Sequence, residues 1–270
     1  MSSLASLIIS LVLTLFASMT GSYSCATGTF TYVRVTEIWR YPVKSMGGES
    51  LRECDVCELG LVGDRCWGVL DLETGLTLTG RRTPELLMAS ARLADGEVAI
   101  TLPDGREVGE GDADALSSWL GRDVSLRAAS LEASGRYENP VDIDNESDWI
   151  EWNGPEGTFH DSTKSRLTVV STATLRDWDI RRFRTNIVVD GSGEDEFVGG
   201  RITLGSGSNR VVAQGTKRVD RCIMVTRPQP GIEADRSVLA TLRDEADMCF
   251  SVGCLVDEPG RVTLGDAISR

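Results

Sequence analysis

The feature that most limits the fold of this chain is a dense succession of short β-strand patterns separated by turn signals. Apolar and polar residues alternate over residues 33–38, as they do on a strand with one buried face. Asp95-Gly96 and Pro103-Asp104-Gly105 are typical of tight turns between neighbouring strands. The pattern predicts an antiparallel barrel or sandwich, mostly β with a few helices. Strands are predicted at 33–38, 66–72, 89–93, 97–102, 167–170, 187–189, 201–204, 210–213, 219–225, 250–256 and 261–264, and helices at 112–120, 237–248 and from 171–175 onward.

The segment 132–158 differs from its surroundings, because it is acidic and shows no regular pattern. Trp149 and Trp152 lie in it, and large aromatic side chains need cover from water. Two interpretations stay open: a loop over a pocket, or a surface segment pinned by its aromatic residues.

The first 33 residues carry no charge, and 4–19 form an apolar run interrupted by serine and threonine. Three interpretations stay open: an export signal, a membrane anchor, or translation from a start upstream of the real one. Cys25 is a poor candidate for lipid attachment, because the residues before it match a lipobox badly. The predicted organisation is this extension, a first β-domain over 34–125 and a larger second domain over 126–270.

Charge and residue counts exclude several classes of protein. A net charge of −13 argues against nucleic-acid binding, which needs clustered lysine and arginine. A small anionic ligand would need a local basic pocket, for which Lys44, Arg65 and Arg184 are candidates. His160 is the one histidine, so multi-histidine zinc and iron sites are excluded, and any metal would depend on thiolate, carboxylate or a cofactor's own donors.

The seven cysteines are an odd number in a chain of this size, so we expect a reducing compartment rather than a disulfide framework. The predicted location is the cytoplasm, with export or membrane anchoring through residues 4–19 as the alternative. Cys54 and Cys57 form a Cys-x-x-Cys pair, but no second pair follows at zinc-ribbon spacing, so a structural zinc site is not favoured.

Cys222 is the cysteine that most needs explanation. It follows Lys217-Arg218-Val219-Asp220-Arg221 and precedes an apolar, β-branched run. Taken alone, such a residue is more often a buried small apolar group than a reactive thiol. Other short motifs occur before and after it, and several in order form a stronger signal than any one of them. They are Tyr41-Pro42-Val43-Lys44-Ser45-Met46, Gly63-Asp64-Arg65, Phe159-His160-Asp161, the run from Phe183 to Val189, and, after Cys222, Glu258-Pro259-Gly260 and Gly265-Asp266.

These motifs resemble the MOSC family with its N-terminal β-barrel extension, the group that contains the mitochondrial amidoxime-reducing components and their bacterial relatives. The resemblance covers roughly residues 34–268. It implies an N-terminal β-barrel-like domain followed by a C-terminal MOSC β-barrel domain. It also implies that Cys222 gives the protein sulfur to a molybdenum ion held by the dithiolene of a molybdopterin, a donor that suits a soft metal.

The same resemblance implies the remaining site residues. Ser171 matches a cofactor-contacting position, although a helix N-cap explains it equally well. Asn186 is expected to orient its neighbours or the pterin, and His160 to lie near the cofactor. Arg221 is expected to steer an anionic substrate or a partner, or else to pair with Asp220. The expected cofactor-binding residues are Lys44, Ser45, Arg65, Ser171, Arg184, Asn186 and Asp220.

The chain departs from the family pattern at four positions. Asp220 stands where amidoxime-reducing members often have a hydroxyl residue, and Gly253 where the mitochondrial proteins have an aromatic one. Thr185 replaces a common proline and Val225 a common threonine. Substrate shape and proton delivery are the properties that these changes put in doubt.

The function implied is a molybdenum-cofactor oxidoreductase that reduces hydroxylamines, amidoximes and N-hydroxylated bases. Because no cysteine-rich ferredoxin segment follows Gly265-Asp266, electrons are expected from a separate ferredoxin, cytochrome b5-like protein or flavin reductase. A membrane enters only if the N-terminal segment is an anchor. The alternative is a carrier of the molybdenum cofactor or a sulfur-handling protein without small-molecule turnover, and a third interpretation is a β-rich structural domain.

Overall fold

The structure is a computed structural model that describes residues 33–142 and 147–270. The expectations for residues 1–32, including the export signal and the anchor, therefore lie outside the described residues. Within the described part, every helix is too short or too polar to pass through a lipid bilayer.

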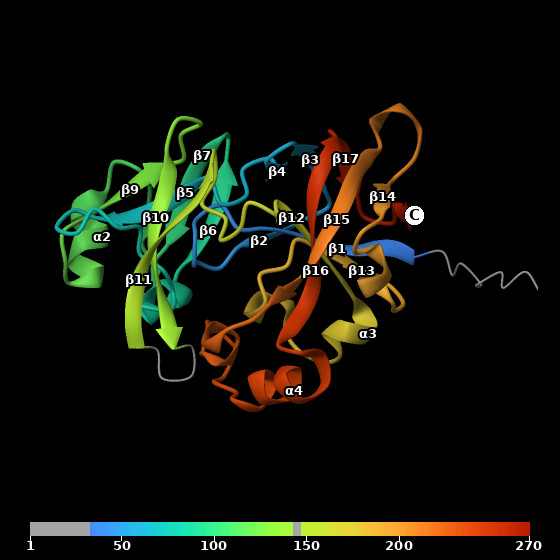
Figure 1. Cartoon of the computed structure of the whole chain (residues 1–270). Coiled ribbons are helices and arrows are strands. Elements are labelled where there is room, and N and C mark those ends of the chain that lie inside the picture. Colours follow the sequence, from blue (N-terminus) through green and yellow to red (C-terminus); the bar gives the residue numbers. More distant parts are fainter. Residues whose placement is uncertain (1–32, 143–146) are drawn as a thin grey trace, which may run out of the picture. The chain divides into compact units, whose positions relative to one another are not determined.

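Strands make up most of the regular structure, which confirms the mostly β prediction (Figure 1). The helices are α2 (Ala113–Leu120), α3 (Thr172–Leu175) and α4 (Ser237–Ala246), with 3-10 turns η1 (Pro84–Met88), η2 (Ile180–Arg182), η3 (Glu194–Phe197), η4 (Gly207–Asn209) and η5 (Ile223–Thr226). The strands are β1 (Val33–Arg40), β2 (Glu49–Leu51), β3 (Glu53–Cys57), β4 (Gly60–Leu61), β5 (Trp67–Asp71), β6 (Ser90–Ala94), β7 (Glu97–Thr101), β8 (Glu107–Val108), β9 (Val124–Ala128), β10 (Ser134–Asp142), β11 (Ser147–Glu156), β12 (Leu167–Ser171), β13 (Ile187–Val189), β14 (Arg201–Leu204), β15 (Val211–Asp220), β16 (Cys249–Glu258), β17 (Gly260–Thr263) and β18 (Ala267–Ser269).

The largest sheet closes into a seven-stranded barrel. Its strand order is β13-β12-β16-β15-β14-β18-β1, and β1 also pairs with β13, so the first and last strands meet. β2 continues the sheet beyond β1. Figure 1 shows β1 in blue among the orange and red strands from the other end of the chain. Because β1 lies in the barrel of the later strands, strand pairing joins residues on both sides of the predicted domain boundary near residue 125. The boundary itself stays a prediction.

Alternating side chains fill the barrel. On β14 the side chains of Ile202 and Leu204 are buried, whereas that of Arg201 is exposed. This two-residue period places one row of apolar side chains inside, and each fully buried aliphatic side chain contributes about 1.5–3 kcal/mol. The interior cluster also takes Val35 and Ile38 from β1 and Leu167 from β12.

A second core lies between the small sheets of the first half. β5 pairs with β9, and β6, β7 and β8 form another sheet. Their apolar residues pack with Leu116 of α2 in one cluster. The predicted helix at 112–120 is confirmed, and Gly121 ends it in the left-handed conformation at φ 66°. Asp95 and Gly96 both have positive φ, as the predicted tight turn between β6 and β7 requires.

The predicted strand over 219–225 is correct only for residues 219–220, and the rest of it is wrong. β15 is one strand that ends at Asp220, and residues 223–226 form η5 instead. The β-branched residues there favour a strand locally, but Val225 packs into an outer cluster with Phe183 and Phe250. Tertiary packing outweighs local propensity at this point, and it places Cys222 on the turn just after the strand.

The segment 132–158 is also more regular than its sequence indicates. β10 and β11 form an antiparallel hairpin in which Tyr137 pairs with Trp152 and Glu138 with Glu151. Acidic residues on both strands hide the alternation of apolar residues that normally identifies a strand. Residues 143–146 lie outside the described part.

Candidate cofactor site

Cys222 lies where the chain leaves the barrel. It has extended backbone at φ −122° and precedes the first residue of η5, and its thiol is free and half-buried. The ladder ends one residue earlier, where the Arg221 N–H donates to the Met248 carbonyl over 2.7 Å. The thiol is therefore held at the end of a barrel strand, on a turn rather than in the sheet.

Arg221, next to this thiol, is held by neutral acceptors. Its guanidinium donates to the Phe183 carbonyl at 3.0 Å, to Thr185 Oγ1 at 3.2 Å and to Ser251 Oγ at 2.5 Å. Burial lowers the pKa of Arg221 to about 10, with Cys222 opposing the shift and Arg65 adding to it. Among the described residues, Arg221 makes no ion pair with Asp220. Asp220 Oδ1 instead accepts from Lys217 Nζ at 2.9 Å.

Arg65 and Arg184 bring the two halves of the chain together. Nη2 of Arg65 donates to the Arg184 carbonyl at 2.7 Å, and its Nη1 pairs with Asp64. Arg184 donates to the carbonyls of Met46 and, at 3.3 Å, Val43. Both arginines adopt positive φ, which is uncommon for side chains of this size. Burial and, after it, the charge of Arg65 lower the pKa of Arg184 to about 10.

Lys44 and Ser45 lie in the same region. Nζ of Lys44 donates to the Phe159 carbonyl at 3.0 Å and to Asp161 Oδ1 at 2.6 Å, and it lies 4.1 Å from the ring centre of Tyr137. Burial lowers the pKa of this amine, and Asp161 opposes the shift. Ser45, also at positive φ, accepts from the Gly80 N–H at 2.8 Å.

The turn that contains Gly80 joins Ser45 to the neighbourhood of Cys222. Arg227, just after η5, donates to the Gly80 carbonyl at 2.5 Å and to the Arg81 carbonyl at 2.9 Å. A Cβ added to Gly80 would lie 2.8 Å from the methyl of Met224. The turn therefore fits closely against η5 on one side and bonds to Ser45 on the other.

Ser171 and Asn186 have structural tasks. Ser171 Oγ accepts from the Thr174 N–H at 3.2 Å, which makes it the N-cap of α3. The Asn186 side chain accepts from Thr168 and donates to the Trp39 carbonyl at 3.2 Å, so it ties β12 to β1. These contacts account for both side chains, and contact with a cofactor stays a prediction.

His160 lies beside Asp64. Its Nε2 is 3.8 Å from Asp64 Oδ2 and is buried without a hydrogen-bond partner among the described residues. Burial, together with the charge of Arg65, lowers the pKa of His160 to about 3. The imidazole is therefore neutral at neutral pH.

Tyr41 is the site residue that sequence reasoning missed. Its buried ring has the guanidinium carbon of Arg184 at 4.5 Å and that of Arg65 at 5.0 Å from its centre. Its hydroxyl is buried, with no hydrogen-bond partner in the described part of the chain. Burial raises the pKa of this hydroxyl, and the two arginines oppose the shift. The Tyr-Pro-Val-Lys motif contained the residue, but only the fold shows that two arginines meet on its ring.

The charges of this region fit an anionic group. Among the described residues, Arg184 and Arg221 bond to carbonyls and hydroxyls, and of the three arginines only Arg65 contacts a carboxylate, that of Asp64. Arg184 and Arg221 are half-buried, so each carries part of the cost of taking a cation out of water, and a bound anion offsets that cost. The orphaned Tyr41 hydroxyl adds a donor. Among the described residues no group of three or more His, Cys, Asp or Glu side chains could hold a metal, so a metal here would depend on a cofactor's own donors and on Cys222.

Two of the departures from the family pattern have local explanations. Thr185 is fully buried and its hydroxyl accepts from Arg221. Gly253 lies on β16, where an added Cβ would be 2.6 Å from Ser165 Oγ. The strand therefore has no room for an aromatic residue at Gly253 without movement of its neighbours.

Comparison with known proteins gives two family matches in chain order. The model described as the MOSC N-terminal beta barrel domain matches residues 32–136, and the MOSC domain matches residues 154–269. The chain is 25% identical to mitochondrial amidoxime-reducing component 1 of Homo sapiens, over 87% of this chain and 82% of that protein. It is also 25% identical to mitochondrial amidoxime reducing component 2 of Bos taurus, with the same coverage. Among solved structures, the YUAD protein from Bacillus subtilis is 14% identical, covers 88% of this chain and 94% of its own, and has a TM-score of 0.39.

Proposed function

Because the chain belongs to the family that joins a MOSC N-terminal beta barrel domain to a MOSC domain, we propose that it binds a molybdenum–molybdopterin cofactor and reduces N-hydroxylated compounds. The substrate class comprises hydroxylamines, amidoximes and N-hydroxylated bases. The reaction consumes two electrons and two protons, converts N–OH to N–H and releases water. When bound, the cofactor supplies the two-electron chemistry that breaks the N–O bond.

The observation that carries this proposal is the half-buried Cys222 thiol next to Arg221, which among the described residues bonds to a carbonyl and two hydroxyls and to no carboxylate. Cys222 would give its sulfur to the metal, which needs a deprotonated thiol. Arg221 is adjacent in sequence and places a positive charge beside this ligand position. Lys44, Arg65 and Arg184 would hold the phosphate and the polar edge of the pterin, and Ser45 fixes the turn beside them.

The other expected site residues contribute through placement. Asn186 holds β12 against β1, and Ser171 caps α3 behind the sheet. Asp220 pairs with Lys217 at the rim of the site. His160 is neutral at neutral pH and lies beside Asp64, so in this proposal it does not deliver the protons that the reaction consumes.

Electrons come from a separate partner in this proposal, a ferredoxin, a cytochrome b5-like protein or a flavin reductase. The net charge of −13 favours a partner with a basic docking face. We also place the protein in the cytoplasm, because the six cysteines among the described residues are all free thiols.

The test is metal content and turnover of the full chain made in a host that synthesises molybdopterin. Cys222→Ser removes the proposed ligand, so we expect its molybdenum content to fall at least about tenfold, a loss typical of a missing metal ligand or supporting contact. Cys249→Ser is the matched control, since Cys249 is another half-buried thiol at the same end of the β15–β16 pair, and it should keep its molybdenum.

Two outcomes would contradict the proposal. Full molybdenum in Cys222→Ser would rule out the ligand assignment. Occupied metal in the parent without reduction of benzamidoxime or N-hydroxyadenine by an artificial electron donor would favour the cofactor carrier over the reductase.

A further inference from the structure

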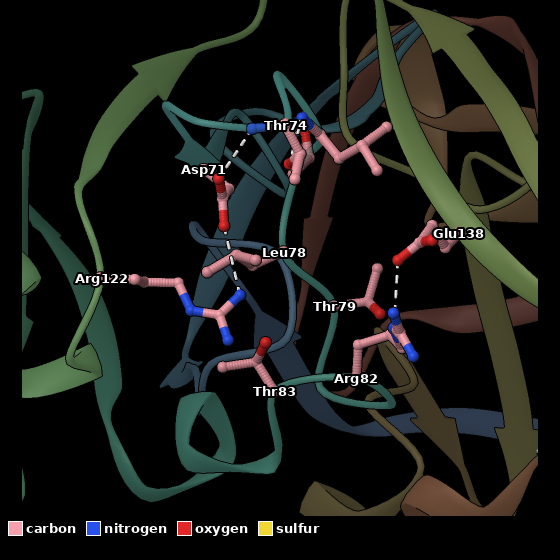
Figure 2. Close-up of a pocket in the computed structure, with 10 residues that line it drawn as sticks. Asp71, Thr74, Leu78, Thr79, Arg82, Thr83, Arg122 and Glu138 are labelled. Atoms are coloured by element: carbon pink, nitrogen blue, oxygen red, sulfur yellow. Dashed lines mark hydrogen bonds and ion pairs between the residues drawn. The ribbon is translucent and has the colours of Figure 1, made fainter. Parts of the chain in front are cut away.

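A cavity of about 400 Å³ lies in the first half of the chain, within the volume range of small-molecule sites (Figure 2). Its walls come from the end of β5, the segment that follows it, and single residues beside β9 and on β10. None of the residues proposed for the cofactor lines it. Thr79, Arg82 and Thr83 line the cavity, whereas the backbone of Gly80 and Arg81 between them bonds to Ser45 and Arg227.

The charges in this cavity are paired. Nη1 of Arg122 lies 3.2 Å from Asp71 Oδ2, and Nε of Arg82 lies 3.0 Å from Glu138 Oε2. Figure 2 shows these two pairs on opposite sides of the space. Two cations and two carboxylates leave no net charge to attract an ion, and the net charge of the chain opposes an anion further. The site therefore favours a neutral ligand with both donors and acceptors.

Two threonine hydroxyls in the wall have unused hydrogen-bonding capacity. Thr83 is 5% exposed, and its hydroxyl, like that of Thr79, is buried without a hydrogen-bond partner among the described residues. In Figure 2 the Thr83 hydroxyl points toward the guanidinium of Arg122 and the space beneath Leu78. A buried hydroxyl without a partner is costly to the folded state. Structures retain such a group where something else repays the cost, and a ligand hydroxyl is the simplest partner here.

We propose that this cavity binds a neutral sugar, a pentose or hexose that is free or forms part of a nucleoside. Each sugar hydroxyl can donate to a carboxylate and accept from a guanidinium, so neighbouring hydroxyls match the two ion pairs. The threonine hydroxyls donate or accept as the ring requires. Leu76 and Leu78 supply the apolar surface against which C–H groups pack. The proposal does not depend on the proposed redox function.

Binding of ribose and adenosine to the full chain tests this, with saturation-transfer NMR for detection and calorimetric titration for affinity. Stronger binding of adenosine would identify the nucleoside as the source of the sugar, and equal binding the free sugar. Because the ligand is neutral, the affinity should not change between low and high salt. Inorganic phosphate serves as the charged probe and should not bind at this site.

Thr83→Val gives the sharpest readout, because valine keeps the shape and removes the hydroxyl. The empty variant should melt at a higher temperature than the parent, since it no longer buries an unpartnered hydroxyl, yet it should bind the sugar about fivefold more weakly. Thr172→Val, an exposed threonine on α3, is the control and should leave sugar affinity unchanged. Arg122→Gln should also weaken binding, which provides a second variant should the first fold poorly.

Three results would overturn the proposal: no detectable binding of either probe, unchanged affinity in both Thr83→Val and Arg122→Gln, or salt-dependent binding of phosphate in competition with ribose.

Discussion

His160 is the single histidine of the chain, and it is buried next to Asp64 and Arg65. Its pKa is lowered to about 3, first by burial and then by the charge of Arg65. In the unfolded chain the imidazole regains an ordinary pKa of about 6.5. Between these two values the unfolded state binds a proton that the folded state does not, so acid favours unfolding.

The free energy of unfolding should therefore be fully retained above about pH 6.5 and decrease as the pH falls from there toward 3. Between pH 7 and pH 5 the protonation of His160 in the unfolded state should lower the free energy of unfolding by about 2 kcal/mol. Carboxylates with ordinary pKa values titrate mostly below that range, so they add little to this loss. Urea unfolding at both pH values measures it. His160→Gln should lose most of this pH dependence, whatever its stability at pH 7. An equal slope in parent and variant would show that His160 is protonated in the folded protein.

At the scale of single elements, local signals predict some parts of the structure and not others. β13 and β14 begin and end where their apolar residues predict, and Gly121 ends α2 as expected. The sequence did not predict the hairpin β10–β11, because its stability comes from packing against the rest of the chain. Tyr137 of β10, for example, is fully buried. η5 was predicted as strand because the packing of Val225 is not visible in sequence.

The candidate site likewise has features that the sequence predicts and contacts that it does not. The motifs predicted Lys44, Arg65 and Arg184 as site residues, because these residues lie within short recognisable runs, and their role beside Cys222 stays a prediction. They could not predict that Asp220 pairs with Lys217, or that Arg221 bonds to Thr185 and Ser251. The two Arg221 contacts join residues 30 or more positions apart in sequence, and their geometry follows from how β15, β16 and the turn after η2 meet. The Asp220–Lys217 pair is local, but Arg221 is a second nearby cation, and only the fold shows which of the two Asp220 contacts.

Gly215 on β15 shows how closely elements approach in the barrel. A Cβ at this position would lie 2.1 Å from the Phe197 carbonyl oxygen, and the Gly215 N–H donates to the Gly200 carbonyl at 2.9 Å. Gly215→Ala should therefore destabilise the fold by about 2–3 kcal/mol, the range of overpacked cores. Thermal or urea unfolding measures this.

Gly111→Ala is the matched control, because no atom of the described residues beyond its chain neighbours lies within 4 Å of the added methyl. Its stability should stay within about 0.5 kcal/mol of the parent. If the two variants are equally stable, the contact between β15 and η3 is looser than the structure shows.

At the scale of the whole molecule, the barrel depends on a strand from the opposite end of the sequence. β1 pairs with β13 on one edge and with β18 on the other, so removing it would expose the edges of both. Val35 and Ile38 of this strand also fill the interior. The later strands cannot close a barrel by themselves.

A fragment of residues 126–270 should therefore lack a cooperative unfolding transition and dispersed amide NMR signals, whereas residues 33–270 should show both. Adding a peptide of residues 33–61, which carries β1 to β4, should restore part of the dispersion in the fragment. A fragment that folds by itself would show that the second predicted domain is independent of β1.

Closure by β1 also bears on how the protein is made. Val33 of this strand pairs with Ile268 of β18, so the strand leaves the ribosome long before its partner is made. Its last residues can pair early with β2, but the residues that pair with β13 and β18 have no native neighbour until those strands emerge, so the nascent chain carries a partly open β-strand that can pair with other chains. The barrel closes only near the end of synthesis, and a chaperone that covers extended apolar segments would raise the yield more than slower elongation would.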